Sequence, residues 1–271
     1  MQKNNGRAET LLRSKQEIDA RRNEKRARLL EFLRTETFTT REIAGEVLQL
    51  QRHATTKTLD MMLKEELIKA HAVEGVMWKT TVYGITVHGA ATASEPGEDF
   101  VWFSPGRLCA STLAHDLWIQ KNRLRAEKAG WTNWSPERAL RRAIATEFQI
   151  TNGVSPWLKV PDALAKNPSG EVIAIEVERT IKSPKRYQQV IFAYLSMIKK
   201  GLISRVEYVC VSPTVFKRLP GIFDRIEFVY HAGEKLKIEE KHRAKFSFHS
   251  ANNWPVAGGT NAAVGSSNQQ A

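Results

Sequence analysis

The stretch that most constrains the fold is VPDALAKNPSGEVIAIEVERTIKSPKRY, residues 160–187. Its two apolar runs, separated by Asn-Pro-Ser-Gly, predict two strands joined by a turn. Acids interrupt both runs, however, at Asp162 in the first and at Glu176 and Glu178 in the second. Because a buried carboxylate without a partner is costly, strands that carry these acids require a cation nearby.

The spacing of the acids permits a divalent metal site. The two glutamates are two residues apart, so both side chains leave the same face of a strand. If Lys166 pairs with Glu171 across the turn, Asp162 falls opposite Ile175, one residue out of register with Glu176. A bulge, or a divergence of the strands beyond the turn, is then needed to bring the acids together. Magnesium accepts one or two carboxylates with waters and phosphate oxygens, so we expect Mg²⁺ or Mn²⁺ as cofactor.

The charge of the chain indicates the class of partner. With 41 Lys and Arg against 29 Asp and Glu, the formal net charge is +12 and the pI about 9.8, which favours nucleic acid. An anionic membrane is the competing partner, but no apolar run approaches the ~18 residues that a spanning helix needs. Cys109 and Cys210 offer neither a disulfide framework nor a zinc ligand set, and the first residues lack the apolar stretch of a signal peptide. We therefore expect a cytoplasmic, DNA-binding protein without membrane insertion.

The patterns along the chain predict an α/β (α+β) protein in four segments. Residues 1–23 are polar and mixed in charge, as in a basic arm or the start of a long helix. Residues 24–95 contain three helical patterns and a β-hairpin, and residues 96–249 a mixed α/β pattern. Residues 250–271 are low in charge and rich in Gly, Ala, Asn and Ser, so we expect a disordered tail.

Three helices followed by a hairpin are the order of a winged helix-turn-helix. Thr39 or Thr40 can cap the second helix, and two β-rich runs flank Glu74-Gly75. The fold places its third helix in the DNA major groove and its wing on phosphates. The DNA contacts expected from these two elements are Arg52, His53, Thr55, Thr56, Lys57, Lys64, Lys79 and Thr80. The alternative is a helical domain for protein contacts or homodimerisation.

The second half alternates helices with strands. STLAHDLWIQKNRLRAEKAG reads as a long helix, and Ser135-Pro136-Glu137 as the start of another, with Ser135 as its N-cap. After the acid-bearing strands we expect a helix over residues 184–200, a strand in SRVEYVCVS, a short helix in PTVFKRLP and a last strand in RIEFVYH.

The acid-bearing strands resemble the core of the PD-(D/E)XK nucleases. The matching residues are Pro161-Asp162, thirteen intervening residues, and Glu176-Val177-Glu178. The usual order of that core is helix, three strands, helix and strand, which we expect over residues 136–232. The resemblance implies a set of metal-binding acids: Asp162, Glu176 and Glu137.

One position departs from that motif. The usual lysine is Glu178 here, and some restriction endonucleases of this fold also have Glu at that position. Alternatively, Lys182, or Lys185 from the next helix, supplies the cation. Lys185 and Arg186 also belong to residues 179–200, which hold six basic residues and no acids. Beside a metal site, such a segment suits a DNA backbone.

A longer resemblance covers most of the chain. A winged helix followed by His115, Trp134-x-x-Glu137, Pro161-Asp162 and Glu176-x-Glu178-x-Thr180-x-Lys182 is similar to the replication-relaxation family, which includes the MobC-type relaxases of mobilisable plasmids. The resemblance implies nicking of double-stranded origin DNA, a nicked single strand as product, and accessory mobilisation and coupling proteins as partners. It implies catalytic roles for three residues: Glu178, Lys182 and His115.

Several of these residues have a structural alternative. His115 could hydrogen-bond within its helix, Glu137 could serve only the helix dipole, and Glu178 could pair with a neighbouring cation. Tyr187 is a candidate covalent nucleophile, although tyrosines more often pack in a core. The run KNRLRAEKAGWTNW, residues 121–134, interleaves cations with tryptophans, which suits either single-stranded DNA or a buried core.

Three functions remain open from the sequence. The first is a MobC-type nicking relaxase, and the second is a restriction-type endonuclease with a winged-helix targeting domain. The third is a DNA-binding regulator or replication accessory protein with an inactive nuclease fold. The complete acid set argues against the third function, because a carboxylate that binds no metal is an expensive residue to keep in a strand.

Overall fold

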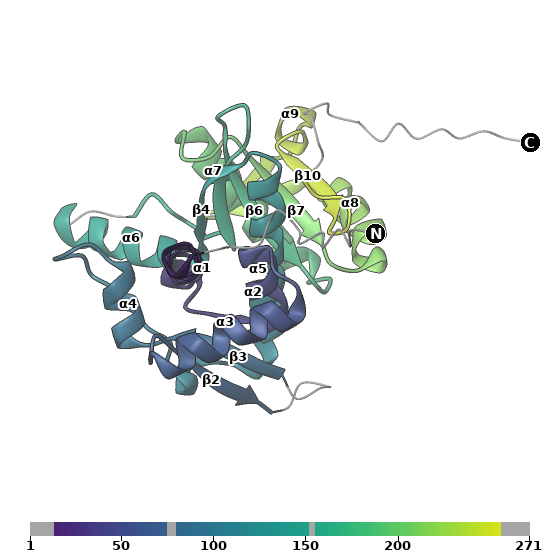
Figure 1. The fold of residues 1–271 in the computed structure, drawn as a ribbon. Coiled ribbons are helices and arrows are strands. Elements are labelled where there is room, and N and C mark those ends of the chain that lie inside the picture. Colours follow the sequence, from purple (N-terminus) through teal and green to yellow (C-terminus); the bar gives the residue numbers. More distant parts are fainter. Residues whose placement is uncertain (1–13, 75–79, 152–154, 256–271) are drawn as a thin grey trace, which may run out of the picture. The chain divides into compact units, whose positions relative to one another are not determined.

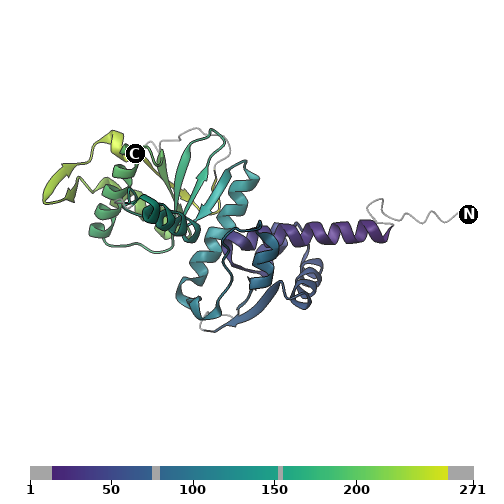
Figure 2. The ribbon, with the colours of Figure 1, turned by 90° about the vertical axis from the view of Figure 1, so that its left-hand side faces the viewer.

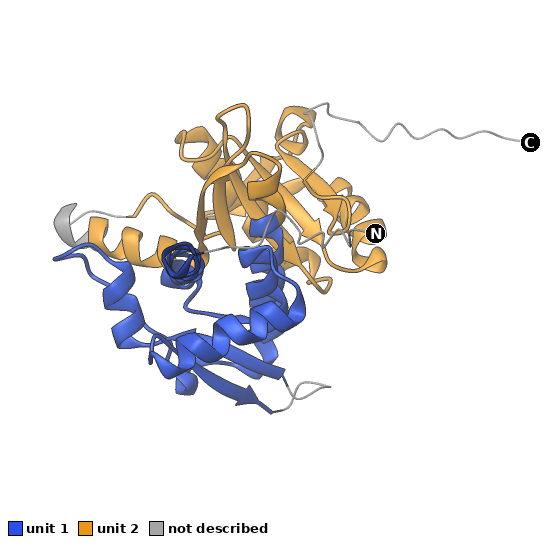
Figure 3. Ribbon diagram, in the orientation of Figure 1, with its two compact units in different colours: residues 1–124 blue, residues 125–271 orange. Residues whose placement is uncertain are grey.

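The computed structural model describes residues 14–74, 80–151 and 155–255, and Figure 1 labels its elements. The chain divides into two compact units, Met1–Leu124 and Arg125–Ala271 (Figure 3). Each unit combines helices with a β-sheet, which confirms the predicted mixed α/β class. Among the described helices, none combines the length with the apolar character that a membrane span requires.

The first unit begins with a long helix. α1 starts at a capping box, in which the side chains of Ser14 and Glu17 each accept the other residue's backbone N–H. Figure 2 shows its N-terminal turns, in purple, extending beyond the rest of the unit, in agreement with their exposed side chains. Part of the predicted arm is therefore helical, and residues 1–13 lie outside the described residues. The elements are α1 (Lys15–Glu36), β1 (Phe38–Thr40), α2 (Arg41–Leu48), α3 (Arg52–Lys64), β2 (Ile68–Val73), β3 (Thr80–Ile85), α4 (Val87–Ala93), the 3₁₀ helix η1 (Pro105–Arg107) and α5 (Ala110–Lys128), which runs across the division.

Thr40 caps α2, as one of the two threonines predicted to do so. Its backbone is extended, and its hydroxyl accepts the N–H of Ile43 at 3.4 Å. Thr39 lies in β1 instead, where its hydroxyl donates to the side chain of Gln120 at 2.8 Å. The apolar faces of α1, α2 and α3 meet in one core, whose fully buried residues include Leu29, Leu33, Ile43 and Leu59.

The sheet of the first unit is antiparallel, with the strand order β1-β3-β2. β2 and β3 form the predicted hairpin, and Val73 pairs with Thr80 at its described end. Residues 75–79 lie outside the described residues, and so does the predicted wing residue Lys79. Three helices thus precede the hairpin, as predicted for residues 24–95, but β1 and α4 were not predicted.

The division between the units lies later than the predicted boundary at residue 95. Phe103 donates its backbone N–H to Ile85 at 2.8 Å, and its ring packs on Gly84, where an added Cβ would lie 2.0 Å from a ring atom. Further along, the Gln120 side chain donates to the carbonyl of Phe38 at 2.8 Å. These contacts join the segment that follows residue 95 to the first unit.

The second unit is built on a five-stranded sheet of order β10-β7-β6-β5-β4. β6, β7 and β10 run parallel, whereas β5 and β4 are antiparallel to their neighbours. The apolar residues of α7 and α8 pack in one core with those of β7 and β10. The elements are β4 (Thr132–Pro136), α6 (Glu137–Thr151), β5 (Ala163–Lys166), β6 (Val172–Glu178), α7 (Pro184–Lys199), β7 (Arg205–Cys210), α8 (Pro213–Asp224), β8 (Phe228–His231), β9 (Glu234–Lys237), α9 (Glu240–Arg243) and β10 (Phe246–Ser250).

Three details of the second unit differ from the sequence predictions. Ser135 and Pro136 pair with β5 as the end of β4, so α6 begins at Glu137 and Ser135 is not its N-cap. The predicted last strand is β8, which pairs with β9 in a separate two-stranded sheet. The edges of the main sheet are β4 and β10, neither of which was predicted as a strand.

The segment after β10 is packed where a disordered tail was predicted. Trp254 is 2% exposed, and its indole N–H donates to the Glu207 carboxylate at 2.6 Å. Its ring meets the buried Trp131 edge-on, with 5.2 Å between ring centroids. Trp131 is therefore a core residue. Of the two roles left open by the sequence, burial in the core and stacking on single-stranded DNA, the structure shows burial. The rest of the predicted tail, residues 256–271, lies outside the described residues.

The register of β5 and β6 differs from the prediction by one residue. Lys166 pairs with Val172, not with Glu171, because Glu171 belongs to the turn and its carbonyl accepts the N–H of Asn167 at 3.0 Å. Since Ala163 pairs with Ile175, continuing the ladder by one residue sets Asp162 opposite Glu176. No bulge is needed to bring these two acids together.

Candidate functional site

Strand β6 brings two glutamates to one buried face. Glu176 is 4% exposed and Glu178 3% exposed. In the parallel ladder they pair with Tyr208 and Cys210, which belong to the core that α7 and α8 cover. Alternation along the strand therefore directs both carboxylates toward the helices.

Asp162 lies beside this pair. Its Oδ2 accepts the backbone N–H of Val177, the residue between the two glutamates, at 2.7 Å. Burial, and next the negative charge of Asp162, raise the pKa of Glu176 to about 7 against the opposing effects of Lys159 and Tyr194. Two like charges thus meet at one place, which is the arrangement that a divalent cation relieves.

Glu176 is held by two donors on one oxygen. The ammonium of Lys159 and the hydroxyl of Tyr194 both donate to Oε1. Lys159 also lies over the Tyr194 ring, with Nζ 5.2 Å from the centroid. Burial raises the pKa of Tyr194 well above its ordinary value, so the phenol stays protonated and acts as a donor.

Glu178 repeats this arrangement. Lys182 Nζ donates to its Oε2 at 3.0 Å, and the Tyr187 hydroxyl donates to the same oxygen at 3.3 Å. Burial raises the pKa of Glu178, and the charge of Lys182 opposes that rise. The Tyr187 oxygen in turn accepts the backbone N–H of Lys182 at 3.1 Å. Because Tyr187 is 1% exposed and burial raises its pKa, it is poorly suited to act as a covalent nucleophile.

The two tyrosines reach the two glutamates because of how α7 crosses the sheet. Tyr187 and Tyr194 are seven residues apart, which is two helical turns, so they lie on one face of α7. α7 connects the parallel strands β6 and β7 and so runs back along them. The later tyrosine consequently meets the earlier glutamate, and the earlier tyrosine the later one.

Glu137 approaches this cluster through its backbone. Its N–H donates to the carbonyl of Asp162 at 2.8 Å, because β4 and β5 pair up to the first residue of α6. Its carboxylate is bound by Arg141, one turn along the same helix. Among the described residues, no three or more His, Cys, Asp and Glu side chains form a group that could hold a metal ion. Of the predicted acids, Asp162 and Glu176 are the pair that comes together.

The remaining predicted catalytic residue lies in the first unit. His115 is on α5 and is partly buried. Its catalytic role therefore stays a prediction that rests on the family resemblance.

The predicted DNA-contact residues of α3 divide into two groups. Arg52, His53 and Lys57 are exposed, as a contact surface requires. Thr55 is 1% exposed, and its hydroxyl donates to backbone carbonyls at 3.0 and 3.3 Å, so it does not suit a DNA contact. Thr56 is partly buried, and its hydroxyl donates to the carbonyl of Arg52 at 3.0 Å.

Other predicted contact residues are also exposed. Lys64 lies in the last turn of α3. Lys185 and Arg186 lie in the first turn of α7, where Ser183 caps the helix. Helix N-termini attract anions, so this turn combines two features that suit a phosphate.

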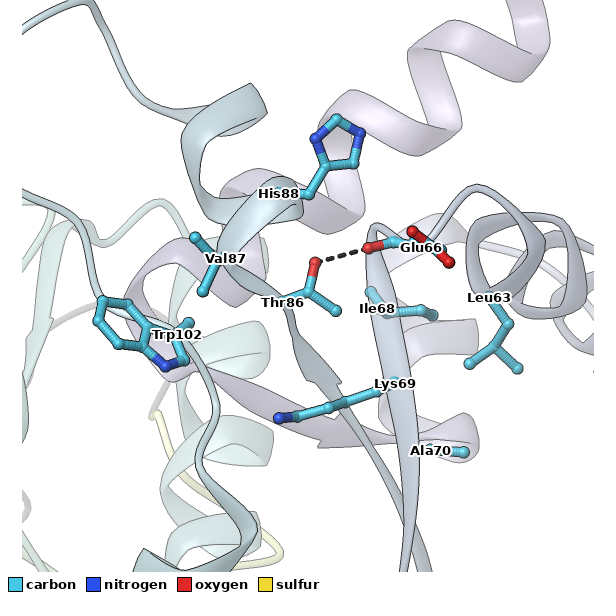
Figure 4. A pocket seen from close by; sticks show the side chains of 9 residues that line it. All are labelled: Leu63, Glu66, Ile68, Lys69, Ala70, Thr86, Val87, His88 and Trp102. Atoms are coloured by element: carbon cyan, nitrogen blue, oxygen red, sulfur yellow. Dashed lines mark hydrogen bonds between the residues drawn. The ribbon is translucent and has the colours of Figure 1, made fainter.

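A hollow of about 610 Å³ lies in the first unit, apart from the predicted residues. Figure 4 shows Trp102, Val87 and Lys69 among its lining, with the Thr86 hydroxyl bound to the backbone carbonyl of Glu66. Trp102 and Val87 are each 51% exposed. Two large apolar side chains are thus exposed at this hollow, whose lining also includes the titratable residues Glu66, Lys69 and His88.

Sequence reasoning missed Lys159 and Tyr194. Lys159 stands just before Val160-Pro161-Asp162, so its nearness to the motif was a usable signal. Tyr194 follows Tyr187 at helical spacing behind an acid-bearing strand, which was a second signal. Neither pattern indicates which acid each residue meets, because that depends on the crossing of α7 over β6.

No protein-family model and no curated protein matches the chain. Among solved structures, the chain is similar to a mutant of ZitR from Lactococcus lactis in its apo form, at 20% sequence identity and a TM-score of 0.24. The match covers 29% of this chain and spans 58% of the ZitR chain. A likeness of this degree carries no argument, and the function is inferred from the residues of the site.

Proposed function

We propose that the chain is a divalent-metal-dependent DNA endonuclease that nicks one strand at a plasmid transfer origin. The observation that carries the proposal is the approach of Asp162 to the buried Glu176 across β5 and β6. The resemblance to PD-(D/E)XK nucleases supports cleavage of a phosphodiester, and the resemblance to replication-relaxation proteins supports nicking at an origin.

The residues of the site fit a divalent cation. Magnesium is commonly bound through one or two carboxylates, with water and phosphate oxygens completing its shell. Asp162 and Glu176 supply two carboxylates, and Oε2 of Glu176 accepts no hydrogen bond from the described residues. When bound, Mg²⁺ or Mn²⁺ would activate a water molecule and stabilise charge on the phosphate under attack.

The cations beside the acids would hold the DNA backbone. Lys182 is 44% exposed although it reaches the buried Glu178, so its ammonium borders both the site and solvent. Lys185 and Arg186 continue this basic surface on the first turn of α7. Basic groups of this kind bind phosphates without regard to sequence.

Selection of the target would fall to the first unit. Its order of three helices and a hairpin supports a winged helix-turn-helix, in which the third helix enters the major groove. Arg52, His53 and Lys57 are the exposed residues of α3 suited to that role.

The test is the cleavage of supercoiled plasmids with and without a candidate transfer origin, in Mg²⁺, Mn²⁺ or EDTA. The proposal expects open circles from the origin plasmid only, and only with metal. Glu176→Gln should abolish them, while Glu234→Gln, on the exposed strand β9, should cut like wild type. Linear DNA from both plasmids would indicate a restriction-type endonuclease.

One observation favours a second candidate, a DNA-binding regulator with an inactive nuclease fold. Lys159 and Lys182 already neutralise the two glutamates without a metal ion. In that case, origin DNA would bind equally well with EDTA or Mg²⁺, and no strand would be cut under any condition.

A further inference from the structure

The two oxygens of the Glu176 carboxylate are used unequally. Lys159 and Tyr194 both donate to Oε1. Oε2 accepts no hydrogen bond from the residues that the structure describes, although an ionised carboxylate has about four acceptor positions over its two oxygens. One oxygen is thus held twice, and the other remains open to a further ligand.

The two donors differ in how firmly they are placed. Tyr194 is fully buried, and its ring belongs to the core around α7, so its hydroxyl has a fixed position. The Lys159 side chain is 24% exposed and ends in a compact ammonium on a flexible stem. An arriving cation can repel the ammonium, but it cannot move the phenol without disturbing the core.

We propose that Tyr194 is a positioning residue, which fixes Glu176 through Oε1 and keeps Oε2 for the divalent cation shared with Asp162. This inference rests on the proposed metal-dependent function, and it identifies Tyr194 as the residue that orients the Glu176 carboxylate toward the metal ion. Hydrogen bonds to ligating carboxylates set their orientation, and their loss typically weakens metal binding about 10- to 100-fold. Tyr194 does not touch the substrate in this role, since it acts through Glu176.

The chain offers a matched control for this role. Tyr208 is also a buried phenol of the same core, and it lies directly across the ladder from Glu176. Its hydroxyl has no hydrogen-bond partner among the described residues. Tyr208→Phe therefore removes the same atom from the same core as Tyr194→Phe, without removing a bond to a glutamate.

The experiment measures the binding of MnCl₂ to the full chain by electron paramagnetic resonance of the free ion, without DNA. Tyr194→Phe should bind Mn²⁺ about 10- to 100-fold more weakly than wild type. Tyr208→Phe should stay within about twofold of wild type. Thermal unfolding in EDTA verifies that both variants are folded. Plasmid nicking by Tyr194→Phe should recover as the Mn²⁺ concentration is raised.

Three results would overturn the inference, and only the third also overturns the proposed function. If wild type binds Mn²⁺ and nicks DNA but Tyr194→Phe has the same affinity, Tyr194 does not position Glu176 while the proposed function stands. An equal loss of affinity in Tyr208→Phe leads to the same conclusion. If wild type neither binds Mn²⁺ nor cuts, the proposed function fails, and the inference fails with it.

Discussion

Asp162 accepts a 2.7 Å hydrogen bond from the backbone N–H of Val177, the residue between Glu176 and Glu178. The bond fixes Asp162, the residue just before β5, against the C-terminal end of β6. The ladder ends where Ala163 pairs with Ile175, so Asp162 comes next in line with Glu176, and its negative charge raises the pKa of that glutamate. The fold itself therefore assembles the pair to which we assign the metal.

Lys159→Met should destabilise the metal-free protein, because Glu176 loses its only cation within the described residues. Removing one partner of a buried ion pair leaves the other charge uncompensated. Because Glu176 can take up a proton instead, we expect the free energy of unfolding to fall by only about 1–3 kcal/mol. Urea unfolding in EDTA measures it. Lys166→Met, at an exposed position of β5, is the control and should change stability by less than about 0.5 kcal/mol. Equal losses in the two variants would contradict the role of Lys159.

The stability of the metal-free protein should depend on pH through Glu176. Its pKa is raised from 4.5 to about 7 in the folded chain, so between these values the folded state binds more protons than the unfolded state. Stability from this group is therefore full below about pH 4.5 and is lost as the pH rises through about 7.

Glu176→Gln removes this titration. Relative to wild type, the variant should gain up to about 3 kcal/mol between pH 4.5 and 7, from a shift at about 1.4 kcal/mol per pH unit. Denaturant unfolding of both proteins in EDTA across this range tests the prediction. A stability difference that does not change with pH would show that Glu176 does not titrate there.

Lys57→Ala should weaken binding to DNA duplexes of any sequence. A lysine that contacts phosphate contributes about one unit to the slope of log K against log salt concentration, so the slope should fall by about one. Fluorescence anisotropy at several salt concentrations measures it. Lys69→Ala, on β2 of the same unit, is the comparison and should leave the slope unchanged. An unchanged slope for Lys57→Ala would remove α3 from the DNA interface.

Gly84→Ala should destabilise the first unit by about 1–3 kcal/mol or more, because the new Cβ would lie 2.0 Å from the Phe103 ring. The ring must move, and the segment that follows residue 95 would loosen. Thermal unfolding and limited proteolysis of that segment measure the effect. Wild-type stability in the variant would show that Phe103 is not packed on β3.

The elements predicted well from sequence are those whose signals are local. The Thr40 cap of α2, the apolar periodicity of α7 and the Val-Ile run of β6 depend on neighbouring residues alone. The edge strand β4 escaped prediction because it is polar and ends in Pro136, which is also typical of a helix start. β10 was missed although Phe246 and Phe248 alternate with polar residues, which is a local signal for a strand.

The candidate site was predicted only in part, because only some of its features depend on local sequence. Acids in apolar strands stand out in a sequence, so Asp162 and Glu176 were found. Their register was missed by one residue because the turn closes between Asn167 and Glu171, which local patterns do not fix. The partners of Glu176, above all Tyr194, depend on how α7 crosses the sheet, and that crossing is a property of the whole unit.

The most direct measurement of the central claim compares wild type with Asp162→Asn in the nicking of a supercoiled origin plasmid, with Mg²⁺ and with EDTA. We expect open circles from wild type with Mg²⁺ alone, and none from the variant, which keeps the shape of the side chain but loses its charge. Equal nicking by Asp162→Asn, or nicking that persists in EDTA, would contradict a metal site at Asp162 and Glu176.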